Sequence, residues 1–195
     1  SRYYLPFVKK AYLIESNPAL SKQIRQELKE QGWDHKVIFI EGDAMQTMLP
    51  EPVDFIIGEL MSIFCANEYQ VQIFRHLRQF LKPDGKLIPE KILNWAQLSQ
   101  ASFENQHLHY PVFFSRHLPE FLSPPALINT INLYNTESVE VDIHTNFSPA
   151  LSGRANSVYL TSWVSLCEGI NFTGTDSLMP PTVRKLDAER PVVAG

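Results

Sequence analysis

The sequence predicts a parallel, doubly wound α/β sheet in its first ninety residues and a β-rich half after it. Short runs of three to five mostly apolar residues recur between residues 11 and 88, as is typical of buried parallel strands. A clear amphipathic stretch separates the first two runs. After Pro89 the pattern changes to alternation, with frequent proline and aromatic residues. We therefore expect two domains, 1–89 and 90–195.

Local signals mark the first strand and helix. The run "AYLI" at residues 11–14 predicts a strand that ends at Glu15. Asn17 is suited to cap a helix and Pro18 to occupy its first position, where the missing N–H costs little. Gly32 predicts the helix end. Residues four apart give this helix one apolar stripe: Leu20, Ile24 and Leu28.

The remaining elements of the first half follow the same logic. We expect strands at 37–40 ("VIFI") and 53–57 ("VDFII"), and a helix that begins near Asn67. The sequence "KPDG" at 82–85 predicts a turn before a short strand at 86–88. In the second half, the alternating stretches 138–147 and 156–166 predict strands. Trp95 and Trp163 are expected in the core of this half.

Composition excludes several classes of protein. The 195 residues are 44% hydrophobic, with a formal net charge of −4 and no Lys/Arg cluster, so nucleic acid is not expected as a partner. No apolar run approaches a membrane span. Cys65 and Cys167 fit no metal spacing and indicate a reducing, cytoplasmic setting. His107 and His109 have no evident third ligand, so we expect no metal site.

Three acids follow predicted strands at the edge where doubly wound sheets bind ligands. Glu15 is placed to accept hydrogen bonds from both hydroxyls of a ribose. Asp43 can accept from an adenine amino group, and the N–H of Ala44 or Met45 can reach a ring nitrogen. Together these residues describe an adenosine pocket.

The third acid, Glu59, is paired with Glu68 across a short loop. Glu59 ends the strand 53–57, and Glu68 stands nine positions later, before the predicted helix. Two carboxylates can grip a guanidinium through paired, charge-assisted hydrogen bonds and so position it for reaction. The location of the pair at a strand end is the basis of this interpretation, because acids nine residues apart are common.

The stretches "AYLIESNP", "VIFIEGDA", "DFIIGELMSIFCANE" and "LKPDGKLIPE" resemble, in order and spacing, the class I S-adenosylmethionine-dependent methyltransferases. The resemblance is closest to the protein arginine methyltransferase branch. It implies S-adenosylmethionine as cofactor and a Rossmann-like sheet followed by a barrel-like domain. It places Glu59 and Glu68 on the paired glutamates that bind the target arginine. It places Glu15 on the ribose-binding acid, and Asp43 and Ala44 on the adenine-contacting turn.

The sequence departs from this family in two places. The family's glycine-rich loop precedes "AYLI", and no such loop is present, so we expect a sheet without its first strand. The sequence ends at "PVVAG", within an expected strand and turn, so we also expect a barrel that is incomplete at the C-terminus. The family also carries a Thr-His-Trp loop in the barrel. Here Thr161–Trp163 has Ser162 in place of histidine. An alignment counted back from the terminal "VVAG" instead places Ser177–Met179 there.

Three functions remain open at this point. The first is a methyltransferase that acts on a nitrogen, with a protein arginine as acceptor. The second is a methyltransferase for a small molecule or another side chain, which the missing histidine favours. The third is a non-catalytic binding module, which the missing loop favours. The resemblance also implies a homodimer, with the aromatic segment 109–125 as a candidate contact.

Overall fold

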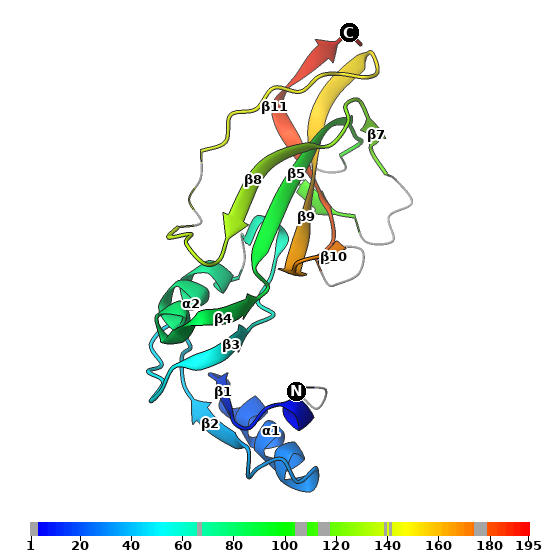
Figure 1. Cartoon of the computed structure of the whole chain (residues 1–195). Coiled ribbons are helices and arrows are strands. Elements are labelled where there is room, and N and C mark those ends of the chain that lie inside the picture. The colour runs from blue at the N-terminus through cyan, green and yellow to red at the C-terminus, as the bar shows by residue number, and fades with distance from the viewer. Residues whose placement is uncertain are drawn as a thin grey trace.

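The structure is a computed structural model that describes residues 4–65, 68–103, 109–112, 118–138, 140, 142–173 and 179–195. The chain forms an elongated molecule in which three parts follow one another along the sequence (Figure 1). The first contains β1, β2 and α1, the second contains β3, β4 and α2, and the third contains the large antiparallel sheet.

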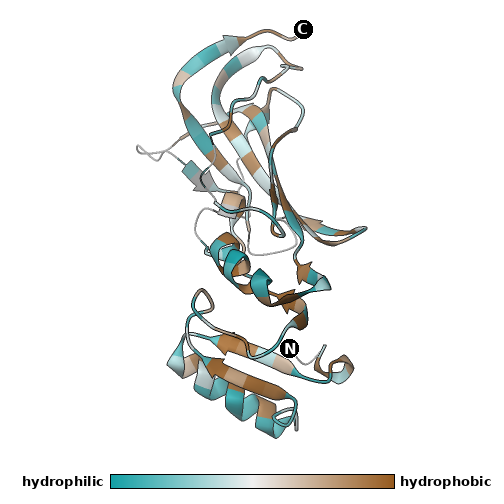
Figure 2. Cartoon of the chain, turned by 60° about the vertical axis from the view of Figure 1, so that its left-hand side comes forward, coloured by the Kyte–Doolittle hydropathy of each residue, from teal (hydrophilic) through white to brown (hydrophobic). Residues whose placement is uncertain are grey.

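The first part is a parallel strand pair covered by one helix. β1 (Ala11–Glu15) and β2 (Val37–Glu41) pair in register, with α1 (Pro18–Glu30) between them in sequence. The predicted cap is confirmed, since Oδ1 of Asn17 accepts from the N–H groups of Ala19 and Leu20. Figure 2 shows mostly hydrophobic residues in these strands and mostly hydrophilic residues in the helix. The predicted stripe is only partly buried, because Leu28 is buried whereas Leu20 is exposed.

The second part repeats this arrangement. β3 (Val53–Ile57) and β4 (Leu81–Ile88) are parallel, and α2 (Gln70–Leu77) lies between them in sequence. The predicted turn at 82–85 was wrong, since these residues lie inside β4. Val53 pairs with Leu81 and Phe55 with Lys86, so residues 82–85 interrupt the ladder without partners on β3. The strand predicted at 86–88 is confirmed, because these residues pair with Phe55, Ile56 and Ile57. The predicted helix start near Asn67 lies outside the described residues.

The two strand pairs do not join into one hydrogen-bonded sheet. Within the described ranges, β1 pairs with β2 and β3 with β4, and no ladder connects the pairs. The expected doubly wound sheet is therefore present as two parallel halves. Both halves keep the order strand, helix, strand. A ligand site is therefore still expected at the carboxyl ends of these four strands.

The third part is a curled antiparallel sheet with the order β6-β11-β9-β5-β7, in which β10 pairs with β9 and β8 with β5. The predicted strand at 156–166 is confirmed as part of β9. The strand predicted at 138–147 is absent from residues 142–147, which are irregular, while Val139 and Val141 lie outside the described residues. The strands are β5 (Lys91–Gln100), β6 (His109–Pro111), β7 (Glu120–Phe121), β8 (Ala126–Asn132), β9 (Gly153–Cys167), β10 (Ile170–Thr173) and β11 (Thr182–Val192).

One hydrophobic core joins the second part to the large sheet. It combines residues of β3, α2 and β4 with residues of β5, β8, β9 and the segments that flank them, so α2 is held against both. The buried members are Ile56, Val71, Phe74, Leu77, Leu87, Ile92, Ile131, Leu133, Val164 and Met179.

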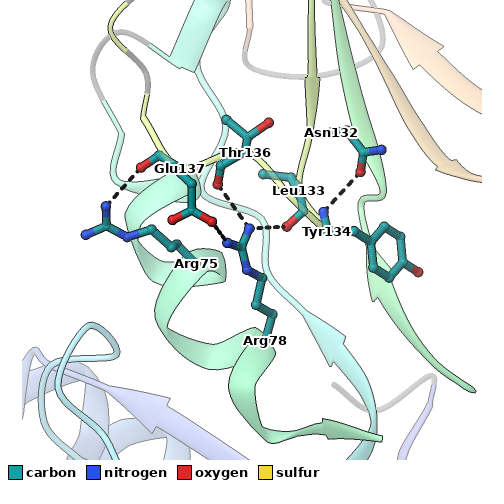
Figure 3. Close-up of polar contacts among 7 residues, drawn as sticks. All are labelled: Arg75, Arg78, Asn132, Leu133, Tyr134, Thr136 and Glu137. Carbon is teal, nitrogen blue, oxygen red and sulfur yellow. Dashed lines mark hydrogen bonds and ion pairs between the residues drawn. The ribbon is translucent and has the colours of Figure 1, made fainter. Parts of the chain in front are cut away.

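Arginines at the C-terminal end of α2 reinforce this junction (Figure 3). Nη1 of Arg78 donates to the carbonyl oxygen of Thr136 over 3.0 Å and to that of Leu133 over 3.5 Å, and Nη2 pairs with the carboxylate of Glu137. Nη1 of Arg75 donates to the carbonyl oxygen of Glu137 over 2.9 Å. The turn after β8 is thereby fixed to α2.

Candidate active site

The ends of β1 and β2 bring the predicted adenosine-binding residues together. Glu15 and Glu41 are register partners, and the N–H of Gly42 donates to the carbonyl oxygen of Glu15 over 3.0 Å. The turn that contains Asp43 therefore begins directly beside Glu15. The side chain of Glu15 is already oriented, because its Oε1 accepts from the N–H of Asn17 over 2.7 Å.

The carboxylate of Asp43 organises the turn at 43–47. Its Oδ1 accepts from the N–H of Met45 over 2.8 Å, and its Oδ2 accepts from Nε2 of Gln46 over 3.3 Å. The N–H of Met45 is thus already engaged, which leaves the N–H of Ala44 as the better of the two predicted donors. The turn is tied to α2, since Nε2 of His76 lies 2.8 Å from the carbonyl oxygen of Thr47.

Glu59 and Glu68 lie at the two ends of the loop between β3 and α2. Both side chains are exposed. Glu59 stands two residues beyond the end of β3, and Glu68 stands two residues before α2 begins. The loop is thus anchored at one end in β3, where Ile56 is buried, and at the other end in α2, where Val71 and Phe74 are buried.

A buried amide links the two ends of this loop. The side chain of Gln70 is fully buried, its Oε1 accepts from the N–H of Leu60 over 2.9 Å, and its Nε2 donates to the carbonyl oxygen of Gly58 over 3.3 Å. These two backbone groups belong to the neighbours of Glu59. Gly58 itself packs closely on α2, because a Cβ there would lie 2.8 Å from Cε2 of Phe74.

The middle of the loop is attached to the large sheet. Phe64 has φ 59° and ψ 15°, a left-handed conformation uncommon for a bulky residue. Its N–H donates to Oγ of Ser162 over 3.1 Å, and that hydroxyl donates to Oδ1 of Asn94 over 2.7 Å. Asn94 and Ser162 are fully buried register partners on β5 and β9. Ser162, the residue that the alignment through Thr161–Trp163 selects, therefore contacts the loop from β9. Ser177 and Leu178 of the other alignment lie outside the described residues.

Trp163 is not a core residue, contrary to the prediction. Its side chain is 46% exposed and lies beside Trp95, with ring centroids 5.5 Å apart. Neighbouring residues on a strand point to opposite faces, so burial of Ser162 exposes the residue that follows it.

Gln70 and Asn94 were not predicted from the sequence. A signal existed for Asn94, which is a polar residue at an inward position of the pattern Ile92, Asn94, Ala96 on β5. Buried polar side chains of this kind need partners and so indicate a specific contact. Gln70 carries no such signal, because a glutamine at the start of a helix is ordinary.

The described part of the chain contains neither a cluster of metal-binding side chains nor a membrane-spanning helix. No group of three or more His, Cys, Asp or Glu residues there could hold a metal ion. No helix there is both long enough and apolar enough to cross a membrane.

Comparison with known proteins shows a resemblance to the protein arginine methyltransferases. The family model described as PRMT5 arginine-N-methyltransferase matches residues 7–88. An uncharacterized protein of Methanocaldococcus jannaschii is 27% identical over 181 residues, which cover 92% of this chain and 68% of that protein. The protein arginine N-methyltransferase 5 of Oryza sativa subsp. indica is 29% identical over 147 residues, which cover 74% of this chain and 22% of the rice protein.

Solved structures agree on the fold. The Arabidopsis thaliana protein arginine methyltransferase 10 superposes with a TM-score of 0.78 at 16% identity, over 96% of this chain and 70% of that one. The Trypanosoma brucei PRMT1 enzyme-prozyme heterotetrameric complex with AdoHcy gives a TM-score of 0.77 at 15% identity, over 96% and 69%. The family model and the sequence relatives confirm the resemblance to the protein arginine methyltransferases. The two solved structures confirm the predicted fold, a Rossmann-like half followed by a barrel half.

Proposed function

We propose that this chain forms the catalytic part of an S-adenosylmethionine-dependent methyltransferase whose acceptor is an arginine side chain of a protein. The observation that carries the proposal is the pair Glu59 and Glu68, exposed at the two ends of a loop that is anchored in β3, in α2 and in the large sheet. Support also comes from the family match at residues 7–88, which includes both glutamates. The chain spans only 22% of the length of the rice enzyme, so the activity of the whole protein is part of the proposal.

The residues at the ends of β1 and β2 fit S-adenosylmethionine by the chemistry of their groups. Glu15 offers carboxylate oxygens to the two ribose hydroxyls. Each Asp43 oxygen already accepts one hydrogen bond and has a lone pair left for an adenine amino group. When bound, the cofactor supplies a methyl group on a positively charged sulfur, which is an activated electrophile.

Glu59 and Glu68 act on the acceptor. As carboxylates they accept charge-assisted hydrogen bonds from a guanidinium, and two such groups fix its plane as well as its position. Orientation of the reacting nitrogen is the main contribution that such a pair can make to the rate. Their Oε atoms can also accept the proton that the nitrogen loses.

Other parts of the proposal rest on the sequence. We propose domains at 1–89 and 90–195; β4 ends at Ile88, and β5, which begins at Lys91, belongs to the other sheet. A cytoplasmic location stays a prediction based on two isolated cysteines. A homodimer also stays a prediction, and residues 113–117 of its candidate contact segment lie outside the described residues. Of the similar proteins, the Trypanosoma enzyme is described as a heterotetrameric complex.

The test is methyl transfer by the whole protein from labelled S-adenosylmethionine to matched peptides that contain either arginine or lysine. We expect label in arginine alone, and we expect Glu59→Gln or Glu68→Gln to lower kcat/KM by about 100-fold or more. Glu41→Gln is the control, because Glu41 is exposed at the end of a strand and outside the loop. Label in a small-molecule fraction would instead favour the second function. Cofactor binding without any transfer, or no binding at all, would favour the non-catalytic module.

A further inference from the structure

We infer that Gln70 is a positioning residue that sets the placement of Glu59 for acceptor binding. The inference rests on the proposed function, in which Glu59 binds the acceptor. Gln70 does not reach the acceptor itself, since its side chain is fully buried at the start of α2. It acts through the backbone on both sides of Glu59.

Both the oxygen and the nitrogen of the Gln70 amide form hydrogen bonds with this backbone. Its oxygen accepts from the N–H of Leu60 over 2.9 Å, and its nitrogen donates to the carbonyl oxygen of Gly58 over 3.3 Å. The two bonds bracket Glu59 and so restrict the rotation of the peptide units on either side of it. Few side chains could make both bonds, because the site needs one donor and one acceptor on a planar group.

The anchor for these bonds is rigid. Gln70 begins a helix whose inward residues Val71, Phe74 and Leu77 are all buried in the shared core. Phe74 also lies against Gly58, where there is no room for a Cβ. The backbone before Glu59 is thus fixed by packing and by a hydrogen bond to the same helix.

Gln70 also couples the backbone position of Glu59 to that of Glu68. Glu68 is two residues before Gln70 along the chain, and Glu59 lies between the two residues that Gln70 contacts. A shift of α2 would therefore carry the backbone at both ends of the loop with it. This coupling is useful for a pair that must grip one guanidinium, because small misplacements of a binding group lower the rate strongly.

The test compares Gln70→Met with Gln72→Met in the whole protein. Methionine has about the same side-chain volume as glutamine but cannot form the hydrogen bonds of Gln70 with Leu60 and Gly58. Gln72 is the matched control because it lies on the same helix and its Oε1 is buried without a partner in the described structure. We expect Gln70→Met to lower kcat/KM for an arginine peptide by about 10- to 100-fold. We expect S-adenosylhomocysteine affinity to be unchanged, because Glu15 and Asp43 lie on other elements. Gln72→Met should leave both quantities unchanged.

A second variant keeps the test valid if Gln70→Met does not fold. In Gln70→Glu, the ionised carboxylate can still accept from Leu60 but cannot donate to Gly58, whereas the protonated acid can do both. The ratio of variant to wild-type kcat/KM should therefore rise as pH falls. A purely structural role predicts no such rise at temperatures where both proteins are folded.

The outcomes separate the inference from the function on which it rests. If Glu59→Gln is inactive while Gln70→Met behaves like Gln72→Met, the inference is wrong and the proposed function stands. A pH-independent ratio for Gln70→Glu would likewise overturn the inference. If the wild-type protein methylates no arginine, or if Glu59→Gln keeps full activity, the proposed function fails and the inference fails with it.

Discussion

The hydroxyl of Ser162 donates to Oδ1 of Asn94 over 2.7 Å, and both side chains are fully buried between β5 and β9. The same hydroxyl accepts the N–H of Phe64 over 3.1 Å. This pair connects the barrel half to the loop that carries Glu59 and Glu68. Because Phe64 adopts a left-handed conformation that costs about 1–3 kcal/mol for a non-glycine residue, the surrounding contacts have to hold it there.

The first prediction is that Ser162→Ala impairs both stability and methyl transfer. The change leaves the N–H of Phe64 and Oδ1 of Asn94 without this partner, which should lower the free energy of unfolding by about 1–3 kcal/mol. Release of the loop should also lower kcat/KM for an arginine peptide by about tenfold. Urea denaturation and steady-state kinetics measure the two effects.

Ser157→Ala provides the control. Ser157 is fully buried on the same strand, and its Oγ lies 2.9 Å from that of Ser99, so it too forms a hydroxyl pair within the sheet. It should lose stability without losing specific activity. Equal loss of activity in both variants would show that Ser162 acts only through stability.

The second prediction concerns the close approach of Gly58 to Phe74. In Gly58→Ala the new Cβ would lie 2.8 Å from Cε2 of a ring that is almost fully buried, so either the ring or the start of the loop must move. We expect a loss of about 1–3 kcal/mol in the free energy of unfolding, as is typical of overpacked sites. In a protein that already carries Phe74→Leu, Gly58→Ala should cost less free energy of unfolding than it does in the wild type.

Gly42→Ala is the matched control for this prediction. A Cβ at Gly42 would meet nothing nearer than Oγ1 of Thr47 at 4.0 Å. Its effect on stability should stay within about 0.5 kcal/mol. If the two alanine variants were equally stable, the contact with Phe74 would not constrain the loop.

Short sequence signals, such as a helix cap or an apolar run, correctly predicted the first helix and the first three strands. Asn17 and Pro18 fixed the start of α1, and the apolar runs gave β1, β2 and β3 to within one residue at each end. These signals act over a few residues, so neighbouring sequence is sufficient. The turn expected at 82–85 was wrong for the opposite reason, since β4 pairs with β3 both before and after these residues, at Leu81 and from Lys86 onward.

For the candidate site too, residues next to a local signal were predicted and residues that depend on tertiary contacts were not. Glu15, Asp43 and Glu59 could be recognised as candidates from the sequence, because each follows an apolar run that predicts a strand. The supports of the loop depend on tertiary contacts. Asn94 and Ser162 are 68 residues apart, and Phe64 and Ser162 are 98 apart, so no local pattern relates them.

The third prediction is that Glu15→Gln weakens cofactor binding. Glutamine keeps a carbonyl oxygen for the N–H of Asn17, so the local structure at the end of β1 should persist. The lost charge weakens hydrogen bonds from ribose hydroxyls, since bonds to ionised acceptors are about twice as strong as neutral ones. We therefore expect the Kd for S-adenosylhomocysteine to rise by about tenfold, measured by calorimetry on the whole protein.

Glu41→Gln separates a ribose contact from a general loss of negative charge at this edge. Glu41 is the register partner of Glu15 and ends the neighbouring strand, so the two variants change the formal charge equally at nearly the same place. Only Glu15→Gln should weaken binding if its carboxylate contacts the ribose. Equal weakening in both would mean that the edge attracts the cofactor through its overall charge, and unchanged binding in both would exclude Glu15 from the cofactor site.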